Sequence, residues 1–123
     1  MDGSSISIVS VPVSDQERAK QWYSEVLGFV VERDDEMGPG MRWVMLRPAG
    51  GGAAITLTTW FETMPPGSRK GTVLRVPDIE AAVARLRSQG AFAIDAEIAD
   101  EPWGRYVTVD DPDCNGWVVQ QDR

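Results

Sequence analysis

The fold is decided by a cassette that occurs twice in the chain. The first copy begins with Val11-Pro12-Val13-Ser14-Asp15 and the second with Leu74-Arg75-Val76-Pro77-Asp78. In each copy a β-rich run ends at an acidic residue suited to cap a helix, an amphipathic stretch follows (16–27 and 79–89), and a glycine, Gly28 or Gly90, returns the chain to strand. Asp15 and Asp78 lie about half the chain apart. Self-similarity at this period predicts two copies of one structural unit, with any pocket between them.

Outward from the two helices, the sequence predicts the element order βαβββ in each unit. Strands are expected at 6–13, 29–33, 41–46 and 53–59, and again at 71–76, 91–98, 106–109 and 116–121. Residues 34–40 and 50–52 are expected to be turns, and 60–70 the loop that joins the units. Ser14 and Glu17 have the spacing of a capping box. We therefore expect one α+β domain over residues 1–123, with module 1 at about 5–60 and module 2 at about 70–122.

Composition excludes several classes of protein. With 12 basic and 19 acidic residues the net charge is −7, which argues against nucleic acid and anionic membrane surfaces as partners. No apolar run approaches the ~20 residues of a membrane span, and no basic segment opens the chain, so we expect a cytoplasmic protein. Cys114 is the only cysteine, which rules out an intrachain disulfide. The absence of histidine removes the commonest general base and the commonest metal ligand.

Four short motifs point to a known family. In chain order they are Trp22-Tyr23-Ser24-Glu25-Val26-Leu27-Gly28-Phe29, Val76-Pro77-Asp78-Ile79, Pro102-Trp103-Gly104-Arg105 and Asp111-Pro112-Asp113-Cys114-Asn115. In this order and spacing the chain resembles the vicinal oxygen chelate superfamily, which holds glyoxalases, bleomycin-resistance proteins and extradiol dioxygenases. The resemblance covers nearly the whole chain. It implies two βαβββ modules that form a cupped mixed sheet and pair in a homodimer. Cys114 departs from the family, which usually has glycine in that turn.

The resemblance also implies where a metal would be held, with one ligand from each of four cup strands. Those positions fall at Ile8, Thr56, Gly71 and Val118, give or take one residue. None is a usual ligand for zinc, iron or manganese, and the Thr56 hydroxyl alone could not hold a metal. We therefore expect no metal and no cofactor, as in the ligand-sequestering branch typified by bleomycin-resistance proteins. Whether the protein is an enzyme stays open, and the replaced ligands favour the answer no.

The expected lining of the cup is small and apolar, which suits a flat organic ligand. The resemblance implies that Ile8, Thr56, Gly71 and Val118 face the cup. If they do, strand alternation gives Arg75 and Gln120 the same facing, and these two are candidate polar anchors. Of the five tryptophans, Trp22 and Trp117 are expected in the core. The other three either pack ordinarily or form aromatic walls against a planar ligand. The candidate ligand-binding residues are Ile8, Trp43, Thr56, Trp60, Arg75, Trp103, Tyr106 and Gln120.

The sequence thus predicts a non-catalytic small-molecule binding protein that sequesters an aromatic natural product or antibiotic, in the manner of self-resistance proteins. Its expected partners are a ligand with a planar aromatic part and a second copy of the chain, with no nucleic acid and no membrane. One alternative is a lyase or isomerase of glyoxalase-like fold that works without metal or with unusual metal ligands. Another is an interaction module that has no ligand.

Overall fold

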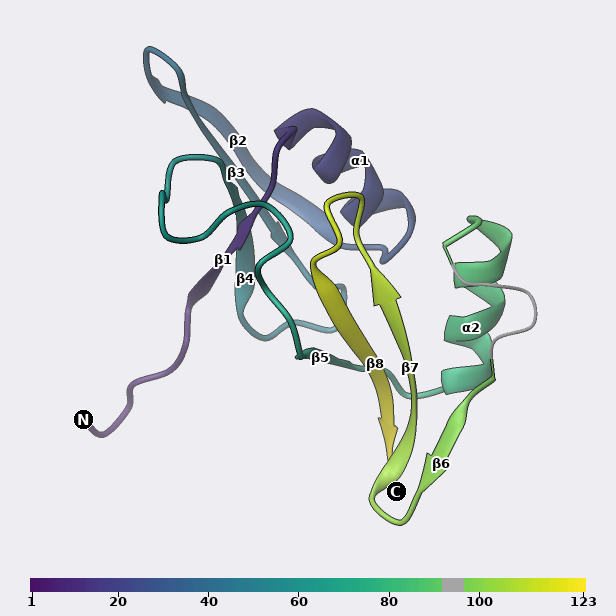
Figure 1. Ribbon diagram of the computed structural model, residues 1–123. Coiled ribbons are helices and arrows are strands. Elements are labelled where there is room, and N and C mark those ends of the chain that lie inside the picture. The colour runs from purple at the N-terminus through teal and green to yellow at the C-terminus, as the bar shows by residue number, and fades with distance from the viewer. Residues whose placement is uncertain (92–96) are drawn as a thin grey trace.

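The chain forms two four-stranded sheets of the same topology, each carrying one helix (Figure 1). A computed structural model describes residues 1–91 and 97–123, and these counts refer to that part of the chain. Module 1 has the strand order β1-β4-β3-β2, with β1 (Ile8–Pro12), α1 (Gln16–Glu25), β2 (Val30–Gly38), β3 (Met41–Arg47) and β4 (Ala54–Thr58). Module 2 has the order β5-β8-β7-β6, with β5 (Thr72–Arg75), α2 (Ile79–Ser88), β6 (Ala99–Glu101), β7 (Gly104–Asp110) and β8 (Gly116–Asp122). The predicted α+β fold of two βαβββ modules is confirmed.

Both sheets are mixed in the same way. The first strand of each module pairs in parallel with the last, β1 with β4 and β5 with β8, and the remaining neighbours are antiparallel. The crossover that a parallel pair requires is supplied by the helix and the hairpin that follows it. The repeated cassette found in the sequence is therefore a repeated structural unit.

Each helix begins at the aspartate of its cassette. The Asp15 side chain accepts a hydrogen bond from the backbone N–H of Arg18 (3.0 Å), and Asp78 accepts from those of Glu80 and Ala81. The predicted capping box at Ser14 is wrong, because the Ser14 hydroxyl instead donates to Asp113 Oδ1 (2.6 Å), a charged and therefore stronger acceptor from module 2.

Two of the predicted strand boundaries need correction. Residues 34–38, expected in a turn, belong to β2, whose hairpin with β3 extends away from the rest of the molecule (Figure 1). The carboxylates of Asp34 and Asp35 are tolerated in a strand because each is paired with a cation, Asp35 with Arg33 at 3.1 Å. Of the predicted strand 91–98, residues 92–96 lie outside the described residues, and the strand described in this part of module 2 is β6.

One apolar cluster contains residues from both modules. Val11, Val44, Leu46, Ile55 and Leu57 of module 1 belong to it together with α1 side chains. The module 2 residues of the cluster are Ile79, Val83, Leu86, Val107, Val109, Trp117 and Val119. The expectation that Trp117 is a core residue is confirmed, and Trp22 packs against the cluster half-buried.

The junction between the modules is polar at its centre. Tyr23 of α1 is fully buried, and its hydroxyl donates to Asp111 Oδ2 (2.7 Å) while accepting from Trp117 Nε1 (2.8 Å). Burial and the neighbouring Asp111 carboxylate raise the pKa of Tyr23, so the phenol stays protonated and remains a donor. Asp111 also accepts from Asn115 Nδ2 (2.8 Å), and Asn115 Nδ2 in turn donates to the Pro12 carbonyl of β1 (2.7 Å). These contacts fix module 2 against α1 and β1.

Candidate functional site

Each sheet has one face toward the apolar cluster and one face away from it. In β4, Ile55 and Leu57 belong to the cluster, so Thr56 and Thr58 point to the opposite side. We call this opposite side the module 1 face. By strand register and alternation it comprises Ile8, Ser10, Trp43, Met45, Thr56 and Thr58. The module 2 face is defined in the same way and comprises Val73, Arg75, Tyr106, Val118 and Gln120.

Aromatic side chains gather on the module 1 face. The ring of Trp60, from the loop after β4, stacks on that of Trp43 with centroids 6.4 Å apart and planes 23° apart. Phe61 continues the row at 6.1 Å from Trp60 and is 46% exposed. The three rings form a connected apolar surface of the kind that planar organic molecules stack on.

The loop that carries Trp60 is fastened to module 2. The Arg69 backbone N–H donates to Asn115 Oδ1 (3.2 Å), the Arg69 carbonyl accepts from the Gly116 N–H (2.8 Å), and Lys70 Nζ donates to the Cys114 carbonyl. Gly67 in this loop has φ +84° and lies against the Asp113 carbonyl. The same turn that holds Tyr23 therefore also holds the base of the aromatic loop.

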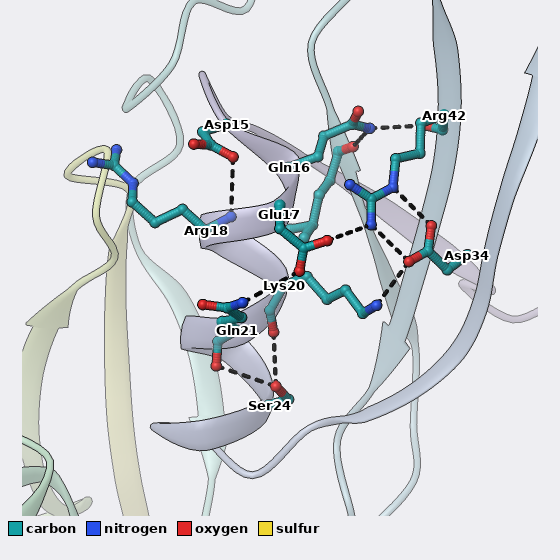
Figure 2. Close-up of polar contacts among 10 residues, drawn as sticks. Asp15, Gln16, Glu17, Arg18, Lys20, Gln21, Ser24, Asp34 and Arg42 are labelled. Carbon is teal, nitrogen blue, oxygen red and sulfur yellow. Dashed lines mark hydrogen bonds and ion pairs between the residues drawn. The ribbon is translucent and has the colours of Figure 1, made fainter.

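The position of Trp43 is set by α1 as well as by its own sheet. Beyond the pairs Met45↔Thr56 and Leu46↔Ile55, the amide of Gln16 lies between β3 and β4 and donates to the carbonyls of Arg42 and Leu57, both at 2.7 Å. The Gln16 side chain thus supplies the hydrogen bond that these two backbone carbonyls would otherwise accept from a neighbouring strand, at the point where the β2–β3 hairpin leaves the sheet (Figure 2).

Charged contacts tie the same hairpin to the helix. Arg42 donates to both oxygens of Asp34 (2.7 Å each) and to Glu17 of α1 (2.9 Å), and Lys20 of α1 reaches Asp34 at 2.8 Å (Figure 2). Hydrogen bonds from Arg42 and then Lys20 hold the pKa of Asp34 well below its usual range. The Asp34 carboxylate is therefore charged at neutral pH. Two contacts connect the hairpin to α1, Arg42 to Glu17 and Asp34 to Lys20.

The module 2 face combines an aromatic pair with a polar cluster. The rings of Trp103 and Tyr106 stack with centroids 5.3 Å apart and planes 14° apart, and Trp103 is 54% exposed. Arg75 Nε donates to Asp122 Oδ2 (2.6 Å), and Gln120 Nε2 donates to Asp122 Oδ1 (2.8 Å). The hydrogen bond from Gln120, together with that from Arg75, lowers the pKa of Asp122. Arg75 is thereby oriented while its side chain stays open to solvent.

The eight predicted site residues fall into two groups of four within one chain. Ile8, Trp43, Thr56 and Trp60 belong to the module 1 group, and Arg75, Trp103, Tyr106 and Gln120 to the module 2 group. Among the described residues, no contact between the two groups is found in the aromatic pairs and hydrogen bonds of their side chains. Alternation could be applied to residues within strands, such as Thr56 and Gln120, but it could predict neither the facing of the loop residues Trp60 and Trp103 nor the separation into two groups.

A cleft of about 800 Å³ lies between the modules, as the duplication predicts, but its lining differs from the predicted residues. Of the eight, Arg75 contributes to it. The rest of the lining was not predicted; it comprises Val9, Leu27, Phe29, the segment 48–55, residues 72–74, Val76, Pro77 and Trp117. These side chains resemble ordinary core residues in sequence. The glycine run 50–52 is the one signal of an open turn at this place.

The side chains present do not fit a metal at the positions that the family would use. Ile8 and Val118 are aliphatic, Gly71 has no side chain, and Thr56 offers a single neutral hydroxyl. Within residues 1–91 and 97–123, no three Asp, Glu or Cys side chains are grouped so that they could hold a metal ion.

The fold and the two open faces define a protein of the glyoxalase-like, two-module class. The family model for the Glyoxalase/Bleomycin resistance protein/Dioxygenase superfamily matches residues 5–119, so the chain belongs to this superfamily. Among its relatives is the uncharacterized protein YetH of Bacillus subtilis (strain 168), 30% identical, with 94% of this chain and 97% of that protein covered.

Two solved structures are similar over the whole fold. TnmS3, an antibiotic binding protein from Streptomyces sp. CB03234, is 41% identical with a TM-score of 0.90, covering 100% of this chain and 99% of that one. A glyoxalase/bleomycin resistance protein from the same Streptomyces strain is 43% identical with a TM-score of 0.84, covering 95% of this chain and all of that one. In the part of this chain that the structure describes, neither helix has the length and apolarity to cross a membrane.

Proposed function

We propose that this protein binds a small molecule with a planar aromatic part and sequesters it without chemical change. The observation that carries the proposal is the connected row of Trp43, Trp60 and Phe61 on the module 1 face. A stacked aromatic contact contributes on the order of 1 kcal/mol beyond the area it buries. The similarity to TnmS3, whose name describes an antibiotic binding protein, supports a natural product or antibiotic as the ligand.

The proposal includes a homodimer and a cytoplasmic location. In this arrangement the module 1 face of one copy lies opposite the module 2 face of its partner, and each pair of faces encloses one ligand site. Two features support the homodimer. The strands β1 and β5 are the edge strands of their sheets, and Ile8 and Val73 on these strands are 42% and 54% exposed. The module 2 group would then add Trp103, Tyr106 and the oriented Arg75 to the aromatic row.

Light scattering tests the assembly. At micromolar concentration we expect a mass of twice 13.5 kDa, because a two-fold pair would cover both open edges and both sets of exposed apolar side chains. Replacing Val73 by Asp should shift the mass toward that of one chain, while Val30→Asp, at the far edge of its sheet, should not. A mass of one chain at every concentration would reject the dimer.

Tryptophan fluorescence tests the ligand site. Titration with riboflavin or proflavine, two flat polycyclic probes, should quench the fluorescence saturably. Trp43→Ala, Trp60→Ala and Trp103→Ala are each expected to remove a stacking surface, and at least one should weaken binding about tenfold, equivalent to roughly 1.4 kcal/mol. Trp22→Phe, on α1 and half-buried against the core, is the matched control and should bind as the wild type does. Wild-type affinity in all three alanine variants would contradict the aromatic site.

A further inference from the structure

Two buried hydroxyl groups in the module 1 face have no hydrogen-bond partner. Thr56 and Thr58 are 1% and 2% exposed, and within the described residues neither Oγ1 atom is paired. Leaving a buried hydroxyl unpaired costs about 1–3 kcal/mol, whereas valine would fill nearly the same space without that cost. Threonine at both places is therefore unexplained by the stability of the isolated chain.

The two hydroxyls lie on the same side of the sheet as the aromatic row, beneath its surface. They are two residues apart on β4, so their Cα atoms are separated by about 7 Å along the strand and both side chains point away from the core. The register places Ser10 of β1 and Met45 of β3 beside Thr56. Trp60 follows Thr58 by two residues and stacks on Trp43 of the same face. An apolar wall thus adjoins a pair of unpaired polar groups.

We infer that Thr56 and Thr58 are the polar anchors of the ligand site and bind a carbonyl or hydroxyl oxygen on the edge of the planar ring system. This inference rests on the proposed function and specifies its ligand as an oxygen-substituted aromatic. Each hydroxyl carries one donor and two acceptor positions and no charge, which matches neutral oxygens better than a phosphate or carboxylate. The net charge of −7 also disfavours an anion.

Thr56→Val and Thr58→Val provide a test that needs no ligand. Because neither hydroxyl is paired in the fold, each variant should melt at the wild-type temperature or above it. A melting temperature several degrees lower would mean that the hydroxyl is hydrogen-bonded within the protein, and it would overturn the inference.

The second arm compares two probes that differ in one oxygen, 2-aminofluorenone and 2-aminofluorene. The wild type should bind the ketone at least fivefold more tightly than the hydrocarbon. Thr56→Val or Thr58→Val should remove most of that preference and leave the affinity for 2-aminofluorene within twofold. Thr72→Val, in the wall of the cleft between the modules and not on the module 1 face, should keep the preference.

The outcomes separate the inference from the proposed function. If both probes bind and the preference for the ketone is absent or survives in both valine variants, the threonines are not the anchors, while the aromatic site stands. If neither probe binds the wild type, the proposed aromatic site fails and the inference fails with it.

Discussion

Replacing Asp111 by alanine should lower the free energy of unfolding by about 3–5 kcal/mol, since it leaves several buried donors without their acceptor. The Asp111 carboxylate accepts from Tyr23 Oη, Asn115 Nδ2 and the backbone N–H groups of Asp113 and Asn115, at 2.7–2.9 Å. Both Tyr23 and Asn115 are fully buried, so water cannot replace the lost partner without opening the junction. Thermal denaturation should register a fall of more than ~10 °C.

The adjacent aspartate is the matched control. Asp110 is exposed at the end of β7, and Asp110→Ala should change stability by less than about 0.5 kcal/mol. Similar losses in both variants would mean that the charge of this turn, rather than the buried contacts of Asp111, accounts for the effect.

Gly67→Ala should cost about 2–4 kcal/mol, because an added Cβ meets both a steric clash and an unfavourable backbone conformation. A Cβ built on Gly67 would lie 2.2 Å from the Asp113 carbonyl oxygen, and φ is +84°. The loop must then withdraw from the 111–115 turn, so Trp60 loses its fixed base. Urea denaturation measures the stability, and tryptophan emission reports the displaced ring.

Gly50→Ala separates this effect from a general intolerance of loop glycines. A Cβ on Gly50 would have no atom within 4 Å, and its φ lies outside the left-handed region. Its expected change is below about 0.5 kcal/mol. An equally stable Gly67→Ala protein would show that the loop does not depend on its close approach to Asp113.

The fold could be predicted because its signals are local and occur twice. Asp15 and Asp78 start the helices, and Gly28 and Gly90 end them at φ +71°. Distant contacts add to these local signals, since Arg85 of α2 donates to the Glu25 and Val26 carbonyls at the end of α1. The extension of β2 through residues 34–38 could not be predicted, since an acidic run looks like a turn until Arg42 and Lys20 are placed beside Asp34. Those cations come from another strand and from a helix.

For candidate residues within strands, such as Thr56 and Gln120, the facing could be argued from strand alternation, which is also local. Their division into two groups, and the walls of the cleft, depend on how the modules are placed against each other. That placement is fixed by contacts such as Tyr23 to Asp111, which are 88 residues apart in the chain. No periodicity or motif in the sequence carries a contact of that kind.

The Gln16 amide between β3 and β4 has a consequence for how the binding site of such a protein can evolve. Because this side chain connects the Arg42 and Leu57 carbonyls where the hairpin leaves the sheet, it helps to position the backbone next to Trp43. Exchanging Gln16 for a shorter or bulkier residue would re-aim the tryptophan while every residue of the module 1 face stayed the same. Selection for a new ligand can therefore begin on a helix at the back of the sheet, before any contact residue is altered.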